Sequence, residues 1–90
     1  MDLSVPAVVR QHVSAVILTW DPVRAVAMGK KSSYDPVIAE IIASLGPKTE
    51  LDVLARSIGN IFRKWFGSAS FKKDFEECLP VARKIIKLLS

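Results

Sequence analysis

The chain has 90 residues, of which 50% are apolar and 24% charged, and its formal net charge is +4 at pH 7. This composition excludes a disordered chain, and the length predicts one domain over residues 1–90. No apolar stretch reaches the roughly 18 residues that cross a bilayer. The single cysteine excludes an internal disulfide, and the first residues lack the basic start of a secretory signal. We therefore expect a cytoplasmic protein without a membrane partner.

Apolar residues recur at helical spacing along nearly the whole chain, which predicts an all-α fold. The first such segment includes Val9, Val13 and Ile17 and predicts a helix over residues 4–19. Ser4 is a suitable N-cap for it, and a proline in the first turn costs no backbone hydrogen bond.

One phrase occurs twice: Trp20-Asp21-Pro22-Val23 and Tyr34-Asp35-Pro36-Val37. Aspartate is a favoured N-cap, proline is favoured at the position after it, and an aromatic residue before the cap can pack on the first turn. The two phrases therefore predict two helix starts, a short helix over residues 22–28 and a longer one over 36–45.

The second half predicts two long helices. One covers residues 50–66, with Thr49 as its N-cap and Gly67 as its C-cap. The other covers residues 71–89, and Pro80 lies within it, so we expect a kink there. The predicted fold is a compact antiparallel bundle of four or five helices.

The predicted core follows the apolar side of these helices. It consists of Val9, Val13, Ile17, Trp20, Ile38, Ile41, Leu54, Ile58, Ile61, Phe62, Trp65, Phe75, Cys78, Ala82 and Ile85.

Residues that could carry catalysis are few. His12 and Cys78 are the only histidine and cysteine, and both lie on apolar helix faces, which favours structural roles over a thiolate–imidazole pair. The ligand spacing of a zinc site is absent, as are the glycine loops that bind phosphates. We expect no enzymatic activity, no catalytic residue, no cofactor and no metal.

The positive charge is concentrated in the second half of the chain. Residues 46–90 hold nine basic and five acidic side chains, whereas residues 1–45 hold four of each. The candidate contacts for a partner or an anion are Arg56, Arg63, Lys64, Lys72 and Lys73. Basic and aromatic residues alternate in this region, a composition also found in single-stranded nucleic-acid platforms. Helical phase instead places the aromatic residues in the core and the basic residues on a solvated face.

Gly59 interrupts the helix over residues 50–66, which costs about 1 kcal/mol relative to alanine. It shares a face with Asp52, Arg56 and Arg63. We expect it to permit close approach of another helix, from this chain or from a partner.

The order of several motifs resembles a family of small bacterial proteins known only as a domain of unknown function. These motifs are Trp20-Asp21-Pro22, Tyr34-Asp35, the stretch from Ile61 to Gly67, and Glu77-Cys78. The resemblance covers about residues 8–88 and implies a compact all-α fold in a bacterial cytoplasm, with no activity to transfer. Two features depart from the family pattern, namely Pro80 and the basic charge balance.

The sequence is compatible with three functions. A non-catalytic protein-interaction module is favoured by surplus apolar residues that could form an exposed patch for a partner or for self-association, namely Leu18, Val53, Val81 and Leu88. Nucleic-acid binding through the basic second half is the alternative, and its affinity would fall steeply with salt. An immunity-type inhibitor of a toxin is a further alternative.

Overall fold

The computed structural model describes residues 7–46 and 49–89, with side chains up to residue 87. Within this part the α-helices are α1 (Ala7–Trp20), α2 (Asp35–Ser44), α3 (Leu51–Phe66) and α4 (Phe75–Leu89). A 3-10 turn, η1 (Lys31–Tyr34), precedes α2, and the described residues contain no strand. The predicted all-α class is therefore confirmed. The predicted helix start at Ser4 lies outside the described residues.

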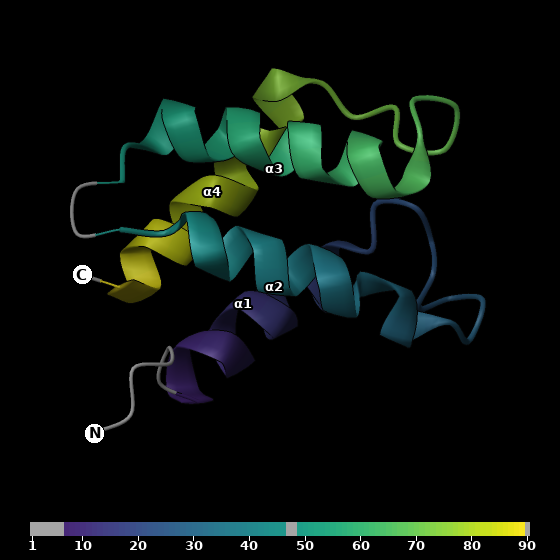
Figure 1. Cartoon of the computed structure of the whole chain (residues 1–90), viewed down its shortest axis with the longest axis horizontal. Coiled ribbons are helices and arrows are strands. Elements are labelled where there is room, and N and C mark those ends of the chain that lie inside the picture. Colours follow the sequence, from purple (N-terminus) through teal and green to yellow (C-terminus); the bar gives the residue numbers. More distant parts are fainter. Residues whose placement is uncertain (1–6, 47–48, 90) are drawn as a thin grey trace.

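The helices form a closed ring around a shared core (Figure 1). Helix α1 packs on α2, α2 on α3, α3 on α4, and α4 returns to α1. Within the described residues, the backbones of the diagonal pairs, α1 with α3 and α2 with α4, do not come close to one another. Helices α2 and α3 lie side by side and run in opposite directions (Figure 1), as their short connection requires.

The core centres on an aromatic cluster. The fully buried ring of Phe62 stacks on Phe71 at 4.9 Å between centroids and meets the edge of Trp20 at 5.4 Å. Tyr34 contacts Phe62 at 5.9 Å and Phe66 at 5.7 Å. Rings contributed by α1, η1, α3 and the α3–α4 connection thus meet at one point, and such pairs are worth about 1 kcal/mol each beyond the area they bury.

Most of the predicted core is confirmed. The buried members are Val13, Ile17, Ile38, Ile41, Leu54, Ile58, Phe62, Cys78, Ala82 and Ile85, and the partly buried ones are Val9, Trp20 and Ile61. Trp65 and Phe75 were wrongly placed in the core, because their side chains are 47% and 40% exposed. Tyr34, Phe71 and Val37 are fully buried and were missing from the prediction.

The predicted helix over residues 22–28 is wrong, because these residues form turns. Asp21 has a φ of 45° and closes α1 with its backbone N–H on the carbonyl of Ile17. Arg24 also has a positive φ, of 62°, which a right-handed helix cannot contain. The Asp21 carboxylate accepts hydrogen bonds from the N–H groups of Val26 and Ala27, and so it organises a turn instead of capping a helix.

Two other predicted caps are also wrong. Asp35 is the first residue of α2, and Tyr34 before it already has right-handed helical backbone angles because η1 continues directly into the helix. Thr49 makes no cap on α3, since Glu50 is the residue before that helix and no side chain caps it. The Thr49 hydroxyl instead accepts a hydrogen bond from the N–H of Gly46 and donates one to its carbonyl.

The remaining predictions concern the ends of α3 and α4. Gly67 has a φ of 82° and ends α3 by donating its N–H to the carbonyl of Arg63, as predicted. Helix α4 begins at Phe75, four residues later than the predicted start at Phe71. It continues through Pro80, and the kink expected there remains a prediction.

The apolar patch expected from Leu18, Val53, Val81 and Leu88 is wrong as a set. Val53 is 48% exposed, but Val81 is buried in the core and Leu18 is half-buried. The side chain of Leu88 lies outside the described residues. Among the described residues, Val53 alone remains as an exposed member of this patch.

Candidate functional site

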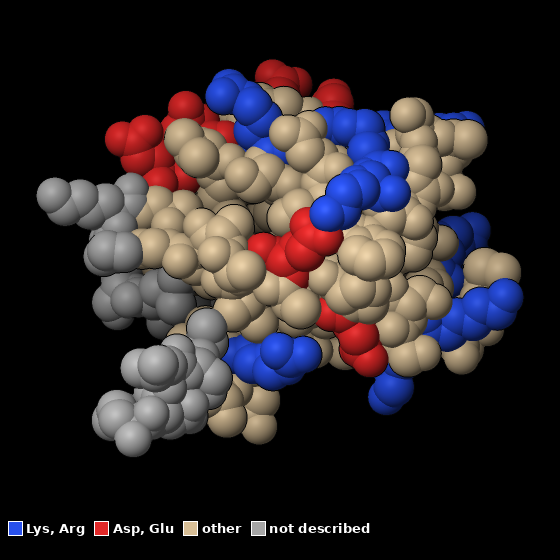
Figure 2. Space-filling model, in the orientation of Figure 1, with Lys and Arg blue, Asp and Glu red and all other residues tan. Residues whose placement is uncertain are grey.

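The five basic residues singled out by the sequence do not form one surface. Lys64 pairs with Glu40 on the side of α2, and Lys73 pairs with Glu77 at 3.6 Å near the start of α4. On the face shown in Figure 2, blue and red side chains are interspersed instead of gathered by charge. Lys72 is exposed and has no ion pair within the described residues. The two arginines are the members that the structure brings together.

Arg56 and Arg63 line one hollow between α3 and the first turn of α4. Its volume is about 240 Å³, and its lining residues are Ala55, Arg56, Gly59, Arg63, Phe75 and Cys78. The arginines are seven residues apart, which is close to two helical turns, so they project from the same side of α3. We call this site the arginine hollow.

Gly59 makes room for one of the two guanidinium groups. It is buried, and a Cβ atom at this position would lie 3.0 Å from Nη2 of Arg63 and 3.5 Å from its Cζ. The Arg63 side chain therefore folds back over the glycine, toward Arg56. The prediction that another helix approaches Gly59 closely is wrong for this position, since the nearest atoms to a Cβ there belong to Arg63 of the same helix.

Neither guanidinium group of the arginine hollow is paired with a carboxylate in the described part of the chain. Arg63 donates from Nη2 to Oδ1 of Asn60 at 3.0 Å, and this is a neutral acceptor. The Arg56 guanidinium lies 5.7 Å from the ring centroid of Phe75, a cation–π contact. Each guanidinium has five N–H donors, so most of their hydrogen-bonding capacity faces solvent.

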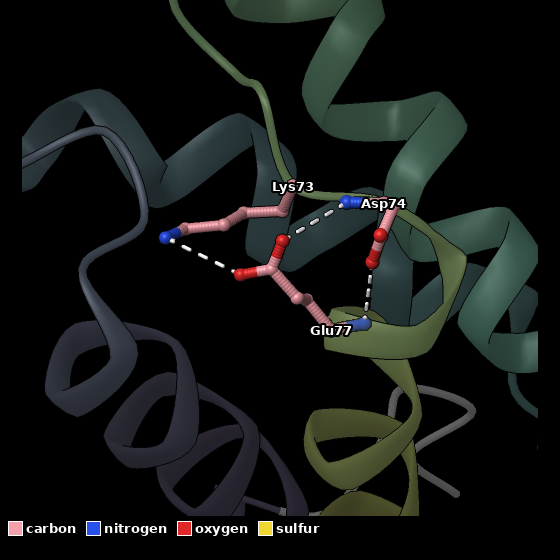
Figure 3. Close-up of polar contacts among 3 residues, drawn as sticks. All are labelled: Lys73, Asp74 and Glu77. Carbon is pink, nitrogen blue, oxygen red and sulfur yellow. Dashed lines mark hydrogen bonds and ion pairs between the residues drawn. The ribbon is translucent and has the colours of Figure 1, made fainter.

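Two acidic residues at the start of α4, close enough to affect Cys78, have partners of their own. Asp74 accepts a hydrogen bond from the N–H of Glu77 at 2.9 Å, and Glu77 accepts one from the N–H of Asp74 at 3.4 Å. Figure 3 shows this reciprocal pair together with the ion pair from Glu77 to Lys73. The arrangement is a capping box at the start of α4. Its sequence signature is an acid three residues before a glutamate. The sequence prediction missed it because the apolar spacing extends back to Phe71, which set the predicted helix start there.

Cys78 forms part of the floor of the hollow and is fully buried. Burial raises the pKa of its thiol to about 11, and the nearby Arg63 offsets only a part of that shift. The thiol is therefore neutral at physiological pH and a poor nucleophile. His12, the other half of the pair considered from the sequence, is half-buried on α1 and does not line the hollow.

A second polar cluster links α2 to α3 on another side of the molecule. Glu40 accepts a hydrogen bond from Nε1 of Trp65 at 2.8 Å and pairs with Lys64. These two contacts, the one with Lys64 first, lower the pKa of Glu40. Lys64 also lies 5.5 Å from the centroid of the Trp65 ring. The exposed tryptophan is thus engaged at its polar edge by neighbouring side chains.

Two further features are absent from the described residues. No group of three or more His, Cys, Asp or Glu side chains is arranged to hold a metal ion. No described helix is both long and apolar enough to cross a membrane.

These features define a small all-α domain whose site is a basic hollow on its surface. The chain belongs to DUF1871, a family described as a domain of unknown function, which matches residues 12–90. The family resemblance noted from the sequence motifs is thereby confirmed at the level of a small uncharacterised domain. No curated protein and no solved structure gave a significant match.

Proposed function

We propose that this protein is a non-catalytic protein-interaction module that binds an acidic surface of a partner through the arginine hollow. The observation that carries the proposal is the convergence of Arg56 and Arg63 on one hollow, where no carboxylate of the described residues pairs with them. Arginine is also the charged residue most enriched at protein interfaces, because its planar donors match carboxylates in pairs.

Phe75 supports a protein partner in particular. Its ring is 40% exposed at the edge of the hollow and is flanked by the Arg56 guanidinium. An exposed aromatic ring beside arginine is the composition from which interface hot spots are built.

The hollow is small, which favours a partner that inserts single side chains. A volume of about 240 Å³ is below the roughly 300–1,000 Å³ of pockets that enclose drug-sized ligands. One or two side chains of a larger surface fit such a volume.

Nucleic-acid binding remains the alternative. Of the five basic side chains that the sequence proposed for it, only some are without an acidic partner. Lys64 and Lys73 already have acidic partners, which leaves Arg56, Arg63 and Lys72. Neutralising several phosphates is what gives such binding its steep dependence on salt. A toxin neutralised by this protein would be one protein partner of the proposed kind.

We place the module in the cytoplasm of a bacterium. The free, buried Cys78 suits a reducing compartment, and the bacterial setting follows the resemblance of the motifs.

The test uses the full chain and two double variants with the same change in charge. The site variant carries Arg56→Gln and Arg63→Gln. The control carries Arg83→Gln and Lys84→Gln, two exposed positions on α4 that do not line the hollow. Each tagged protein is incubated with extract of its source organism, with and without nuclease treatment, and the captured protein is then purified and titrated calorimetrically.

We expect one protein that binds the wild type and the control alike, and that binds the site variant about tenfold or more weakly. Equal binding to the site variant would overturn the role of the hollow. Capture that disappears with nuclease would transfer the assignment to nucleic acid, and a second copy of the chain as the captured species would indicate self-association.

A further inference from the structure

Resting on the proposed function, we infer the chemical character of the partner segment: an aromatic or aliphatic residue flanked by carboxylates. In this arrangement the apolar side chain lies against Phe75, and the carboxylates pair with Arg56 and Arg63. The arginine hollow supplies both halves of the recognition from residues that are in place before the partner arrives.

The carboxylates are indicated by the two guanidinium groups. They line the same hollow, and within the described residues their hydrogen-bond and cation–π partners are neutral groups, the Asn60 amide and the Phe75 ring. Arginine pairs with carboxylates through two parallel hydrogen bonds, which fix orientation as well as supplying energy. Two such groups spaced along α3 are suited to two carboxylates on one short segment.

The two acidic side chains of the capping box do not compete for that position. Asp74 and Glu77 are committed to the capping box of α4, and Glu77 also pairs with Lys73 (Figure 3). The three floor residues Ala55, Gly59 and Cys78 carry no negative charge at neutral pH, because the first two are apolar and the Cys78 thiol is protonated. They therefore do not repel an anion.

The apolar half is indicated by Phe75, one face of which is covered by Arg56 while 40% of the side chain is exposed. Filling this hollow of about 240 Å³ with one apolar side chain would remove aromatic surface from solvent and would strengthen the adjacent charge pairs by lowering the local dielectric.

The experiment titrates isotope-labelled full-length protein with three blocked pentapeptides and follows backbone amide shifts by NMR. The probes are Gly-Asp-Phe-Asp-Gly, its neutral counterpart Gly-Asn-Phe-Asn-Gly, and Gly-Asp-Ala-Asp-Gly. We expect the first probe to shift the amides of Arg56, Gly59, Arg63 and Phe75 with millimolar affinity. Loss of either the carboxylates or the phenyl ring should weaken binding about fivefold or more.

The protein variants provide the matched control. Arg56→Gln and Arg63→Gln should each weaken the first probe about fivefold, whereas Arg83→Gln should change its affinity less than about twofold. The inference is overturned if the neutral peptide binds equally well, if Arg83→Gln weakens binding as much as the site variants do, or if no probe shifts these amides at about 10 mM.

Failure of this inference and failure of the proposed function are distinguishable. A captured protein that depends on Arg56 and Arg63, combined with no response to the peptides, would leave the interaction module standing and reject the acid–aromatic segment. Capture that is independent of both arginines would reject the module, whatever the peptides do.

Discussion

The hydroxyl of Tyr34 donates a hydrogen bond of 2.6 Å to Oδ1 of Asp21, thirteen residues earlier in the chain. The two residues come from the repeated phrase, one from each copy. The carboxylate of the first copy also accepts the N–H groups of Val26 and Ala27, while the tyrosine hydroxyl accepts the N–H of Val23 at 3.3 Å. The repeat therefore provides the two halves of one contact that fastens the connection between α1 and α2.

Replacement of Tyr34 by phenylalanine should lower the free energy of unfolding by about 2 kcal/mol. The ring would keep its packing in the aromatic core, but the Asp21 carboxylate would lose a partner that donates a charge-assisted hydrogen bond. Urea denaturation measures the change. Asp21→Gly is the matching variant, because glycine keeps the positive φ of 45° without strain.

The double variant of these two residues isolates their interaction. If the hydrogen bond couples them, the losses of unfolding free energy in the two single variants should add up to more than the loss in the double variant. The excess should be about 1 kcal/mol or more. Strictly additive effects would contradict the coupling.

Acid should weaken the fold through two carboxyl groups. Burial raises the pKa of Asp21, but the hydrogen bonds from Tyr34 and the backbone amides outweigh it and hold the pKa below its ordinary value of 3.8. The contacts of Glu40 with Lys64 and Trp65 likewise hold its pKa below 4.5. A carboxyl whose pKa is lowered by folding stabilises the protein above its unfolded pKa and loses that contribution as the pH falls through its folded pKa.

The melting temperature should therefore be nearly constant from pH 7 to about pH 5, and should fall as the solution is acidified below about pH 4.5. A Tyr34→Phe, Glu40→Gln double variant should show a smaller fall over the same range, since the pKa of Asp21 would lose the lowering effect of the tyrosine hydroxyl and the amide at position 40 would not titrate. Identical acid sensitivity of wild type and variant would show that other groups govern the transition.

The sequence predicted the positions of helices better than it predicted which helical turns are buried by a neighbouring helix. Leu54, Ile58 and Trp65 share one helical phase, yet only the first two are buried. Phase gives the direction in which a side chain points from its helix axis. Whether a neighbouring helix extends far enough to cover that turn depends on packing between segments distant in the sequence.

The repeated phrase shows a similar limit. Asp and Pro favour a helix start locally, and α2 does begin at Asp35. At Asp21 no helix begins, despite this local preference. A positive φ and the hydrogen bond from Tyr34, thirteen residues later, fix a turn there instead. For the candidate site, periodicity correctly placed Arg56, Gly59 and Arg63 on one face. The folding of Arg63 over Gly59 and the opposing position of Phe75 depend on rotamers and on α4, neither of which periodicity specifies.

Cys78 should resist alkylation in the native state. Its side chain is fully buried, and a pKa of about 11, compared with an ordinary 9.0, leaves about a hundredfold less thiolate at neutral pH. Iodoacetamide labelling followed by mass spectrometry should be slow in buffer and fast in denaturing urea. Rapid labelling of the folded protein would contradict the structural role and revive the possibility of a nucleophile.

Gly59→Ala should separate the stability of the fold from binding at the arginine hollow. Alanine in the middle of α3 is favoured over glycine, and the nearest neighbours of its Cβ would be the guanidinium atoms of Arg63, the mobile end of a long side chain. The free energy of unfolding should therefore rise by about 0.5–1 kcal/mol, as measured by urea denaturation. The displaced Arg63 should at the same time bind the acidic partner or peptide less well. A variant less stable than the wild type would show that Arg63 cannot move aside. A variant that binds as tightly as the wild type would show that the folded-back position of this guanidinium is not the one that recognises the ligand.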